Sequence, residues 1–342
     1  MTSGHQEAAA SPPSPDLFID TLMGYQRTAA IKAAVELGLF TAIAAGDGDA
    51  ASIARRTGAA ERGVAILADY LVLLGFLYRE DGAYRLTPSS RIFLDGNSPA
   101  YFGRVVEFLG APEMIDLFLR DPASYVRNGG SIGLANTAPD NPIWVKFAEA
   151  MVPLMVPAVE AVAARAAALP QPPRKVLDIS AGHGAYGIAV ACAVPQAEVW
   201  GLDWSAVLAL AKRNADAAGV GARYHTIAGS AFDVHWGGGY DLILIPSFLH
   251  HFDPAACTAL LHKARQNLAP GGRVMVAEFL RSDGAGGHPW AEAFSFVMLA
   301  TTQAGRAYRA PELNAMARDA GFARATIEPV TPTPHSLVWL EP

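Results

Sequence analysis

The sequence predicts an α/β fold in which a parallel, doubly wound sheet follows a smaller, mostly helical unit. From residue 171 onward, short apolar runs alternate with helical stretches, an order typical of a parallel sheet covered by helices on both faces. Before residue 170, apolar residues mostly recur three and four positions apart, which is the spacing of amphipathic helices. The length of 342 residues fits one large and one small domain.

Composition and charge narrow the classes of protein. Hydrophobic residues make up 51% of the chain and charged residues 17%, which excludes gross disorder. The net charge of -6 argues against nucleic acid or a membrane surface as a partner. Two cysteines, Cys192 and Cys257, exclude a disulfide-rich secreted scaffold and indicate reduced thiols. Because we find no signal peptide and no charge-free apolar run of membrane-spanning length, we expect a cytoplasmic protein.

The N-terminal part predicts a winged-helix domain over residues 16–110, after a disordered tail at 1–15 that is rich in Ala, Ser and Pro. Apolar periodicity predicts three helices, at 18–39, between Asp49 and Gly58, and at 60–74. Two short alternating strands around residues 80–82 then predict a hairpin. The third helix lacks a basic stripe, which favours packing or dimerisation over DNA binding.

The rest of the chain is predicted as a helical linker followed by a sheet domain at 171–342. The linker, residues 111–170, contains a loop at 128–142 that is rich in Gly, Asn and Pro. Five strands alternate with helices and are expected to be parallel, at 175–179, 198–202, 223–227, 241–245 and 273–278. Two closing strands, 325–330 and 336–340, have only a Thr-Pro-Thr-Pro turn between them. We therefore expect an antiparallel strand at the edge of the sheet.

A glycine-rich turn follows the first predicted strand and opens a helix. Gly182, Gly184 and Gly187 match the G-x-G-x-x-G spacing of dinucleotide sites, with Asp203 about 20 residues further on. Asp178 stands just before the glycines, where a pyrophosphate would face a carboxylate. A cationic ligand would be attracted there, and S-adenosylmethionine carries a sulfonium and an α-ammonium group. We therefore predict S-adenosylmethionine as the cofactor, with NAD or a turn without a ligand as alternatives.

Further contacts to this methyl donor are expected at the ends of the next strands. Asp203 is placed to accept hydrogen bonds from both ribose hydroxyls, and Trp204 can lie against the adenine edge. Ser230 can bond the adenine amino group, and Phe232 can pack on the ring or belong to the core instead. Phe252 is a second candidate wall. The predicted cofactor-binding residues are Asp178, Ser180, Gly182, Gly184, Asp203, Trp204, Gly229, Ser230, Ala231, Phe232 and Phe252.

A histidine and a carboxylate end the fourth and fifth strands, where open α/β sheets bind ligands. Methyl transfer from a sulfonium requires that the acceptor lose its proton, and His250 is a suitable general base. Glu278 would fix its tautomer and stabilise the imidazolium. His251 as the base and a purely structural pair are alternatives. A metal held by the histidines with Asp253 and His288 is a further alternative, but metal-ligand spacing is lacking, so no metal is predicted.

Together these motifs resemble the class I S-adenosylmethionine-dependent O-methyltransferases. The resemblance rests on Val-Leu-Asp-Ile-Ser-Ala-Gly-His-Gly at 176–184, Gly-Leu-Asp-Trp at 201–204, Leu-His-His-Phe at 249–252 and Val-Ala-Glu at 276–278. With its winged N-terminal unit, the chain is more narrowly similar to caffeic acid, acetylserotonin and bacterial polyketide O-methyltransferases over residues 18–342. The resemblance implies that His250 and Glu278 fall on the catalytic positions.

The resemblance also implies a Rossmann-like, seven-stranded sheet and a homodimer built through the N-terminal domain. The linker would line a substrate pocket between the domains. Candidate walls, for which ordinary helix core is the alternative, are Phe147, Met151, Met155, Phe294 and Met298. The implied activity is methylation of a hydroxyl group on a small aromatic or polyketide-like secondary metabolite.

Three positions depart from the family pattern. Ser230 stands where an aspartate is usual, the usual lysine is absent from the Pro246-Ser247 region, and Tyr308 stands where plant members have a second catalytic glutamate. The last departure leaves one carboxylate to hold His250. It motivates a second hypothesis, C-methylation or a reaction without methyl transfer on the same fold. A third hypothesis is a winged-helix regulator that senses a ligand.

Overall fold

The computed structural model describes residues 13–131, 143–282, 288–331 and 333–342. Contacts divide the chain into two units, residues 1–106 and 107–342. Most of the expected tail at 1–15 and most of the expected loop at 128–142 lie outside the described residues. Within the described ranges, no helix has the length and apolar character needed to cross a membrane.

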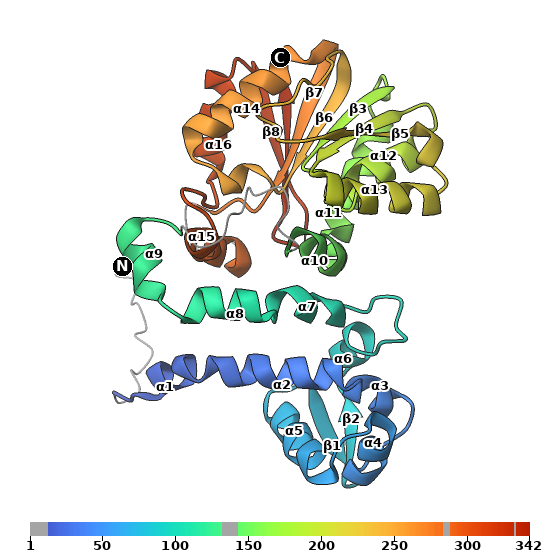
Figure 1. Cartoon of the computed structure of the whole chain (residues 1–342), viewed down its shortest axis with the longest axis vertical. Coiled ribbons are helices and arrows are strands. Elements are labelled where there is room, and N and C mark those ends of the chain that lie inside the picture. Colours follow the sequence, from blue (N-terminus) through green and yellow to red (C-terminus); the bar gives the residue numbers. More distant parts are fainter. Residues whose placement is uncertain (1–12, 132–142, 283–287, 332) are drawn as a thin grey trace, which may run out of the picture. The chain divides into compact units, whose positions relative to one another are not determined.

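The first unit consists of short helices and one two-stranded antiparallel hairpin (Figure 1). Its elements are α1 (Asp16–Leu22), α2 (Gly24–Glu36), α3 (Leu39–Ala44), α4 (Ala50–Thr57), α5 (Glu61–Leu73), β1 (Leu77–Glu80), β2 (Ala83–Leu86), α6 (Pro88–Phe93) and a 3-10 turn (Gly103–Val105). The Asp49 cap is confirmed, since its Oδ1 accepts from the Ser52 backbone N–H at 2.8 Å. The expectation of one helix over 18–39 is wrong. The helix breaks at Met23 and again at Gly38, whose φ of +66° ends α2.

The second unit begins with helices and continues as a sheet with crossover helices. Its helices are α7 (Val106–Leu109), α8 (Pro112–Leu119), α9 (Pro122–Asn128), α10 (Ile143–Ala150), α11 (Val152–Ala167), α12 (Ala185–Ala193), α13 (Ser205–Ala217), α14 (Pro254–Gln266), α15 (Pro289–Thr301) and α16 (Ala310–Asp319). Its strands are β3 (Lys175–Ile179), β4 (Glu198–Asp203), β5 (Tyr224–Ala228), β6 (Tyr240–Pro246), β7 (Leu268–Glu278), β8 (Arg324–Pro329) and β9 (Ser336–Glu341). Short 3-10 turns lie at Gly221–Arg223 and Leu249–His251.

The seven strands form one sheet in the order β5-β4-β3-β6-β7-β9-β8. All neighbours are parallel except β9, which runs antiparallel to both β7 and β8. The predicted antiparallel strand therefore exists, but its expected place at the edge is wrong, because β9 is inserted inside the sheet. Its buried Leu-Val-Trp-Leu run suits an interior position, whereas β8 carries charged residues and ends in Pro329, as edge strands do.

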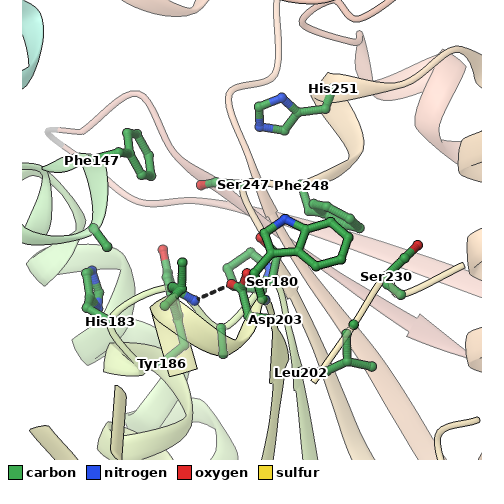
Figure 2. Close-up of a pocket in the computed structure, with 18 of the residues that line it drawn as sticks. Phe147, Ser180, His183, Tyr186, Leu202, Asp203, Ser230, Ser247, Phe248 and His251 are labelled. Atoms are coloured by element: carbon green, nitrogen blue, oxygen red, sulfur yellow. Dashed lines mark hydrogen bonds between the residues drawn. The ribbon is translucent and has the colours of Figure 1, made fainter. Parts of the chain in front are cut away.

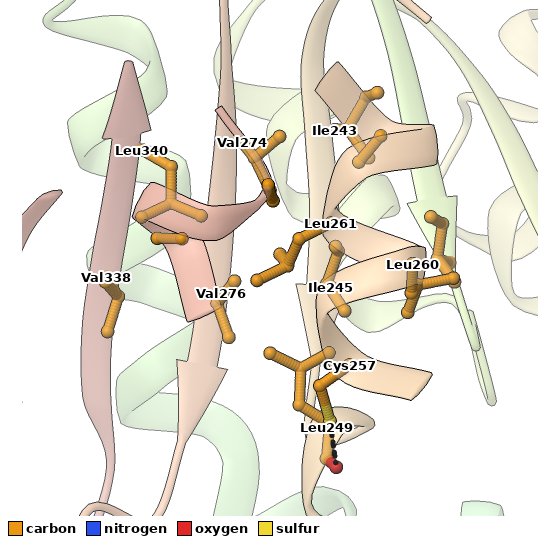
Figure 3. Packing of buried hydrophobic residues seen from close by; sticks show 14 of the residues in the cluster. Ile243, Ile245, Leu249, Cys257, Leu260, Leu261, Val274, Val276, Val338 and Leu340 are labelled. Carbon is orange, nitrogen blue, oxygen red and sulfur yellow. Dashed lines mark hydrogen bonds between the residues drawn. The ribbon is translucent and has the colours of Figure 1, made fainter. Parts of the chain in front are cut away.

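Helices cover both faces of the sheet (Figure 1). Helices α14 and α16 pack together on one face, and α11, α12 and α13 lie on the other. Figure 3 shows the core beneath α14, where Leu260 and Leu261 meet Ile243 and Ile245 of β6. This packing holds the carboxyl ends of β3 to β7 in one row, so that the loops after them share one edge.

The glycines of α12 and α5 offer a matched test of this packing. A Cβ added at Gly187 would lie 2.7 Å from Val199 Cγ1 and 2.9 Å from Asp178 Oδ2, whereas one at Gly63 would meet nothing within 4 Å. We expect Gly187→Ala to lower the free energy of unfolding by about 1–3 kcal/mol. Gly63→Ala should raise it by about 0.5–1 kcal/mol, because alanine favours an exposed helix. Urea denaturation of both variants measures the difference, and equal effects would contradict the close approach of α12 to β3 and β4.

Candidate active site

A cavity of about 430 Å³ opens at the carboxyl ends of β3 to β6 in the second unit (Figure 2). Eleven of the predicted residues line it, namely Phe147, Met155, Ser180, Gly182, Asp203, Trp204, Gly229, Ser230, Ala231, Phe232 and Phe252. Seven do not, namely Met151, Asp178, Gly184, His250, Glu278, Phe294 and Met298. Lining side chains that the sequence had not suggested include His183, Tyr186 and Phe248.

The backbone at three strand ends around the cavity adopts left-handed conformations. Ser180 follows β3 with φ of +55°, Gly229 follows β5 with φ of +133°, and Ser247 follows β6 with φ of +49°. A residue other than glycine held there costs about 1–3 kcal/mol, and such strain concentrates at ligand sites. Both serines line the cavity, so the strained turns lie at the edge of the sheet where a ligand would bind.

Asp178 lies beneath the glycine turn rather than on the cavity wall. Its Oδ2 accepts from the Gly187 backbone N–H at 3.0 Å, and its Oδ1 has no hydrogen-bond partner among the described residues. Burial raises the pKa of this carboxyl to about 8, against the lowering effect of the Gly187 bond. A cation bound near the turn would stabilise the charged form.

Asp203 reaches the cavity from the end of β4. Its Oδ2 accepts from the Gly182 backbone N–H at 2.8 Å, and its Oδ1 accepts from the Trp204 N–H at 2.7 Å. Burial raises the pKa of the carboxyl, and these two backbone bonds lower it. Each carboxylate oxygen can accept more than one bond, so Asp203 both closes the glycine turn and can still take a diol.

Three phenylalanines form an aromatic wall beside Ser230. The rings of Phe232 and Phe252 lie 4.9 Å apart at 75°, and those of Phe248 and Phe252 lie 4.9 Å apart at 77°. Edge-to-face pairs of this kind are favourable and fix ring orientation. The wall suits a flat heterocycle.

Lys263 of α14 organises the turn that carries Phe232. Its Nζ donates to the backbone oxygens of Ala231, Phe232 and Val234, each at 2.9 Å. The ammonium group also lies 4.8 Å from the ring centroid of Trp236, whose Nε1–H donates to Ala231 O at 3.0 Å. No sequence pattern marked this lysine, because its contacts join α14 to the turn between β5 and β6, which is distant in the sequence.

The predicted pair of His250 and Glu278 is in contact. His250 Nδ1 and Glu278 Oε2 lie 2.6 Å apart, and Oε1 accepts from the backbone N–H groups of Phe248 and His250 at 3.1 and 3.3 Å. An ionised carboxylate only accepts, so the hydrogen bond assigns the proton of a neutral imidazole to Nδ1. His250 Nε2 is thereby left as an acceptor.

His250 and His251 differ in their surroundings. Their rings lie 4.5 Å apart, but only His251 lines the cavity (Figure 2). His250 is 4% exposed, and its ring centroid lies 4.8 Å from that of Phe294 with the two ring planes at 89°. Burial, and then the charge of His250, hold the pKa of His251 well below its usual range. His251 is therefore neutral at pH 7, whereas His250 has a carboxylate that can stabilise a positive charge.

Tyr308 contacts the backbone of the loop that carries His250 and His251, and not the imidazole ring of His250. Its hydroxyl donates to the Phe252 carbonyl oxygen at 2.5 Å and lies 3.7 Å from Cys257 Sγ. Burial raises its pKa above the ordinary value, so it stays protonated. Nearby, a Cβ on Gly305 would lie 2.3 Å from the His250 carbonyl oxygen. The segment after α15 therefore packs directly on the loop that presents the histidines.

The suggested metal ligands have local structural roles. Asp253 caps α14 by accepting from the Ala256 N–H at 2.8 Å, and His288 caps α15 by accepting from the Trp290 N–H at 3.2 Å. In the described part of the chain, no group of three or more His, Cys, Asp or Glu is arranged to hold a metal ion.

Two family models match the chain. An O-methyltransferase domain matches residues 125–323, and an O-methyltransferase dimerisation domain matches residues 19–96. Among curated proteins, 3-hydroxy-5-methyl-1-naphthoate 3-O-methyltransferase of Streptomyces sahachiroi is 29% identical over 341 residues, covering 95% of this chain and 94% of the relative.

Solved structures agree with these matches. A candidate O-methyltransferase of Nostoc punctiforme is 45% identical with a TM-score of 0.91, covering 96% of this chain and 99% of that one. PigF, solved with S-adenosylhomocysteine, is 26% identical with a TM-score of 0.83, covering 97% of this chain and 100% of that one. The donor product in that structure identifies the class of cofactor that this fold binds.

Proposed function

The chain belongs to the S-adenosylmethionine-dependent O-methyltransferases that carry a dimerisation domain, and from this premise we propose that it methylates a hydroxyl group of a small aromatic or polyketide-like secondary metabolite. The observation that carries the proposal is the His250–Glu278 pair, which joins a base to a carboxylate at 2.6 Å beside the donor cavity. The naphthoate named for the Streptomyces sahachiroi relative and the aromatic lining here support a flat aromatic acceptor.

The residues present fit the donor. Asp203 would take the ribose hydroxyls, Ser230 and the aromatic wall of Phe232 and Phe252 would take the adenine, and the turn at Gly182 would allow close approach. The unpartnered Asp178 Oδ1 lies buried beneath that turn, so a cationic group above it offsets the cost of its charge. When bound, the donor supplies a methyl group already activated on a sulfonium.

His250 acts in this proposal as the general base. A phenol near pKa 10 is a weak nucleophile until it loses its proton. The acceptor hydroxyl passes its proton to His250 Nε2 while its oxygen forms the new C–O bond and the C–S bond breaks. Glu278, on Nδ1, then faces an imidazolium and stabilises it. The Glu278 bonds to two backbone N–H groups keep that carboxylate in place.

Apolar side chains would form the acceptor walls. Phe147 and Met155 line the cavity, and Phe294 of α15 meets the His250 ring. Met151 and Met298 are buried, so we assign them a supporting place behind the walls. An aromatic ring between Phe294 and Phe147 would bring its hydroxyl to His250.

The first unit would form the homodimer. In helix α1 no residue is buried, and Leu17, Phe18 and Leu22 are 80%, 67% and 62% exposed. A contiguous exposed apolar stripe of this kind marks an interaction surface. The family model of the dimerisation domain matches residues 19–96, and so begins within α1.

Product analysis tests the proposed reaction. The protein is incubated with S-adenosylmethionine and a panel of hydroxylated naphthalenes, benzoates and polyketide aromatics. We expect a product heavier by one methylene unit with an O-methyl signal by NMR. The same acceptors with the hydroxyl already methylated serve as controls and should not react. A C-methyl product, or an altered product without mass gain, would instead support the second hypothesis.

A further inference from the structure

Two buried polar atoms on the wall of the cavity have no hydrogen-bond partner among the residues that the structure describes. His183 is 5% exposed and Tyr186 is 3% exposed, and both line the cavity. Among the described residues, His183 Nε2 and the Tyr186 hydroxyl have no hydrogen-bond partner. Burying a polar group without a partner is costly. Two such groups, three positions apart in the sequence and both on the wall of one cavity, indicate a ligand that bonds them.

The contacts of His183 show that its free nitrogen is a donor. His183 Nδ1 accepts from the Ala185 backbone N–H at 3.0 Å, so Nδ1 carries no proton in the neutral ring. Burial lowers the pKa of His183 to about 4, so the ring is neutral at pH 7. The proton therefore sits on Nε2. The loop itself is fixed, since the Asn214 side-chain amide donates to His183 O at 2.9 Å.

Tyr186 supplies the second donor. Burial, with the charges of Asp178 and Glu278, raises the pKa of its hydroxyl above the ordinary value, so it keeps its proton. In Figure 2, His183 and Tyr186 lie on the left of the pocket, Ser230 lies on the right, and Asp203 lies between.

We propose that His183 Nε2–H and the Tyr186 hydroxyl together bind the α-carboxylate of the methyl donor. The inference rests on the donor site proposed above. With adenine at Ser230 and ribose at Asp203, the amino-acid end of the donor extends to the opposite side, where these two donors stand. Tyr186 is in the first turn of α12, where the helix dipole also favours an anion. The α-ammonium of the same ligand offsets the nearby carboxylate charges.

The proposed binding of the α-carboxylate by His183 and Tyr186, here called the carboxylate clamp, is tested by measuring how two ligands bind to three variants. Tyr186→Phe removes only the hydroxyl. His183→Asn keeps an acceptor near the Nδ1 position for the Ala185 N–H and removes Nε2. Tyr224→Phe is the matched control, because the Tyr224 hydroxyl is equally buried and unpartnered but does not line the cavity. Calorimetry measures Kd for S-adenosylhomocysteine and for its decarboxylated analogue.

We expect the first two substitutions to weaken S-adenosylhomocysteine about tenfold each, as befits a hydrogen bond to a charged group. The decarboxylated analogue should bind these variants and the wild type alike, and Tyr224→Phe should bind both ligands as the wild type does. Equal weakening of both ligands, or no weakening, would overturn the carboxylate clamp alone. Failure of the wild type to bind S-adenosylhomocysteine would overturn the donor site itself.

Discussion

Replacing His250 by glutamine is expected to lower kcat by about 10²- to 10⁴-fold, which is the usual contribution of a positioned general base. Glutamine can keep a polar contact to Glu278 but cannot accept and hold a proton. Because His250 does not line the donor cavity, the affinity for S-adenosylhomocysteine should stay near the wild-type value. Single-turnover rates with saturating donor, together with calorimetry, separate these two effects.

His251→Gln is the matched control for that experiment. The residue is adjacent, its ring lies 4.5 Å from His250, and it lines the cavity. We expect it to alter donor or acceptor affinity more than the rate of the chemical step, because its depressed pKa makes it a weak base. A large loss of rate in His251→Gln with an active His250→Gln would transfer the role of base to His251.

Glu278→Gln is expected to produce a loss of similar size, about 10²- to 10⁴-fold in kcat. The amide can donate to His250 Nδ1, which would move the imidazole proton to Nε2 and remove the acceptor that the base needs. It also removes the negative charge that stabilises the imidazolium. Steady-state kinetics at saturating acceptor measure the effect.

The double variant tests whether the two residues act together. Residues that act as one unit are strongly non-additive, so His250→Gln with Glu278→Gln should be little slower than the slower single variant. Urea denaturation checks that the fold survives, since Glu278 Oε1 also accepts two backbone bonds. Multiplicative losses, or a Glu278→Gln enzyme at wild-type rate, would contradict the proposed pairing.

The sheet was predictable because its signals are local. Each parallel strand is a short apolar run bounded by turns, and all seven predicted strands are present. The local sequence pattern left open which of the two closing strands pairs with β7. That choice depends on burial on both sides, and the contrast between β9 and the charged β8 carried the needed signal. The breaks at Met23 and Gly38 were missed because an apolar stripe continues across them.

The lining of the cavity was predictable where residues directly follow strands. Asp203, Ser230 and Phe232 follow strands directly, and the structure places them on the cavity. The tautomer of His183 was not predictable from the sequence, because it depends on the hydrogen bond that Nδ1 accepts from the Ala185 backbone N–H. Lys263 was not predicted, because its three hydrogen bonds are to backbone oxygens that are distant in the sequence. Tyr186, in the first turn of the helix after the glycine loop, was by contrast visible in the sequence and could have been considered.

The close packing after α15 bears on how such an enzyme can acquire new substrates. Gly305 leaves no room for a side chain next to the His250 carbonyl, and Tyr308 donates to the Phe252 carbonyl, so the segment after α15 packs directly on the loop that carries the proposed base. Evolutionary change near that exit would disturb proton removal as well as acceptor shape. Divergence in acceptor preference is therefore expected to accumulate at the entry of α15 and along α10, where a library for directed evolution would best be placed.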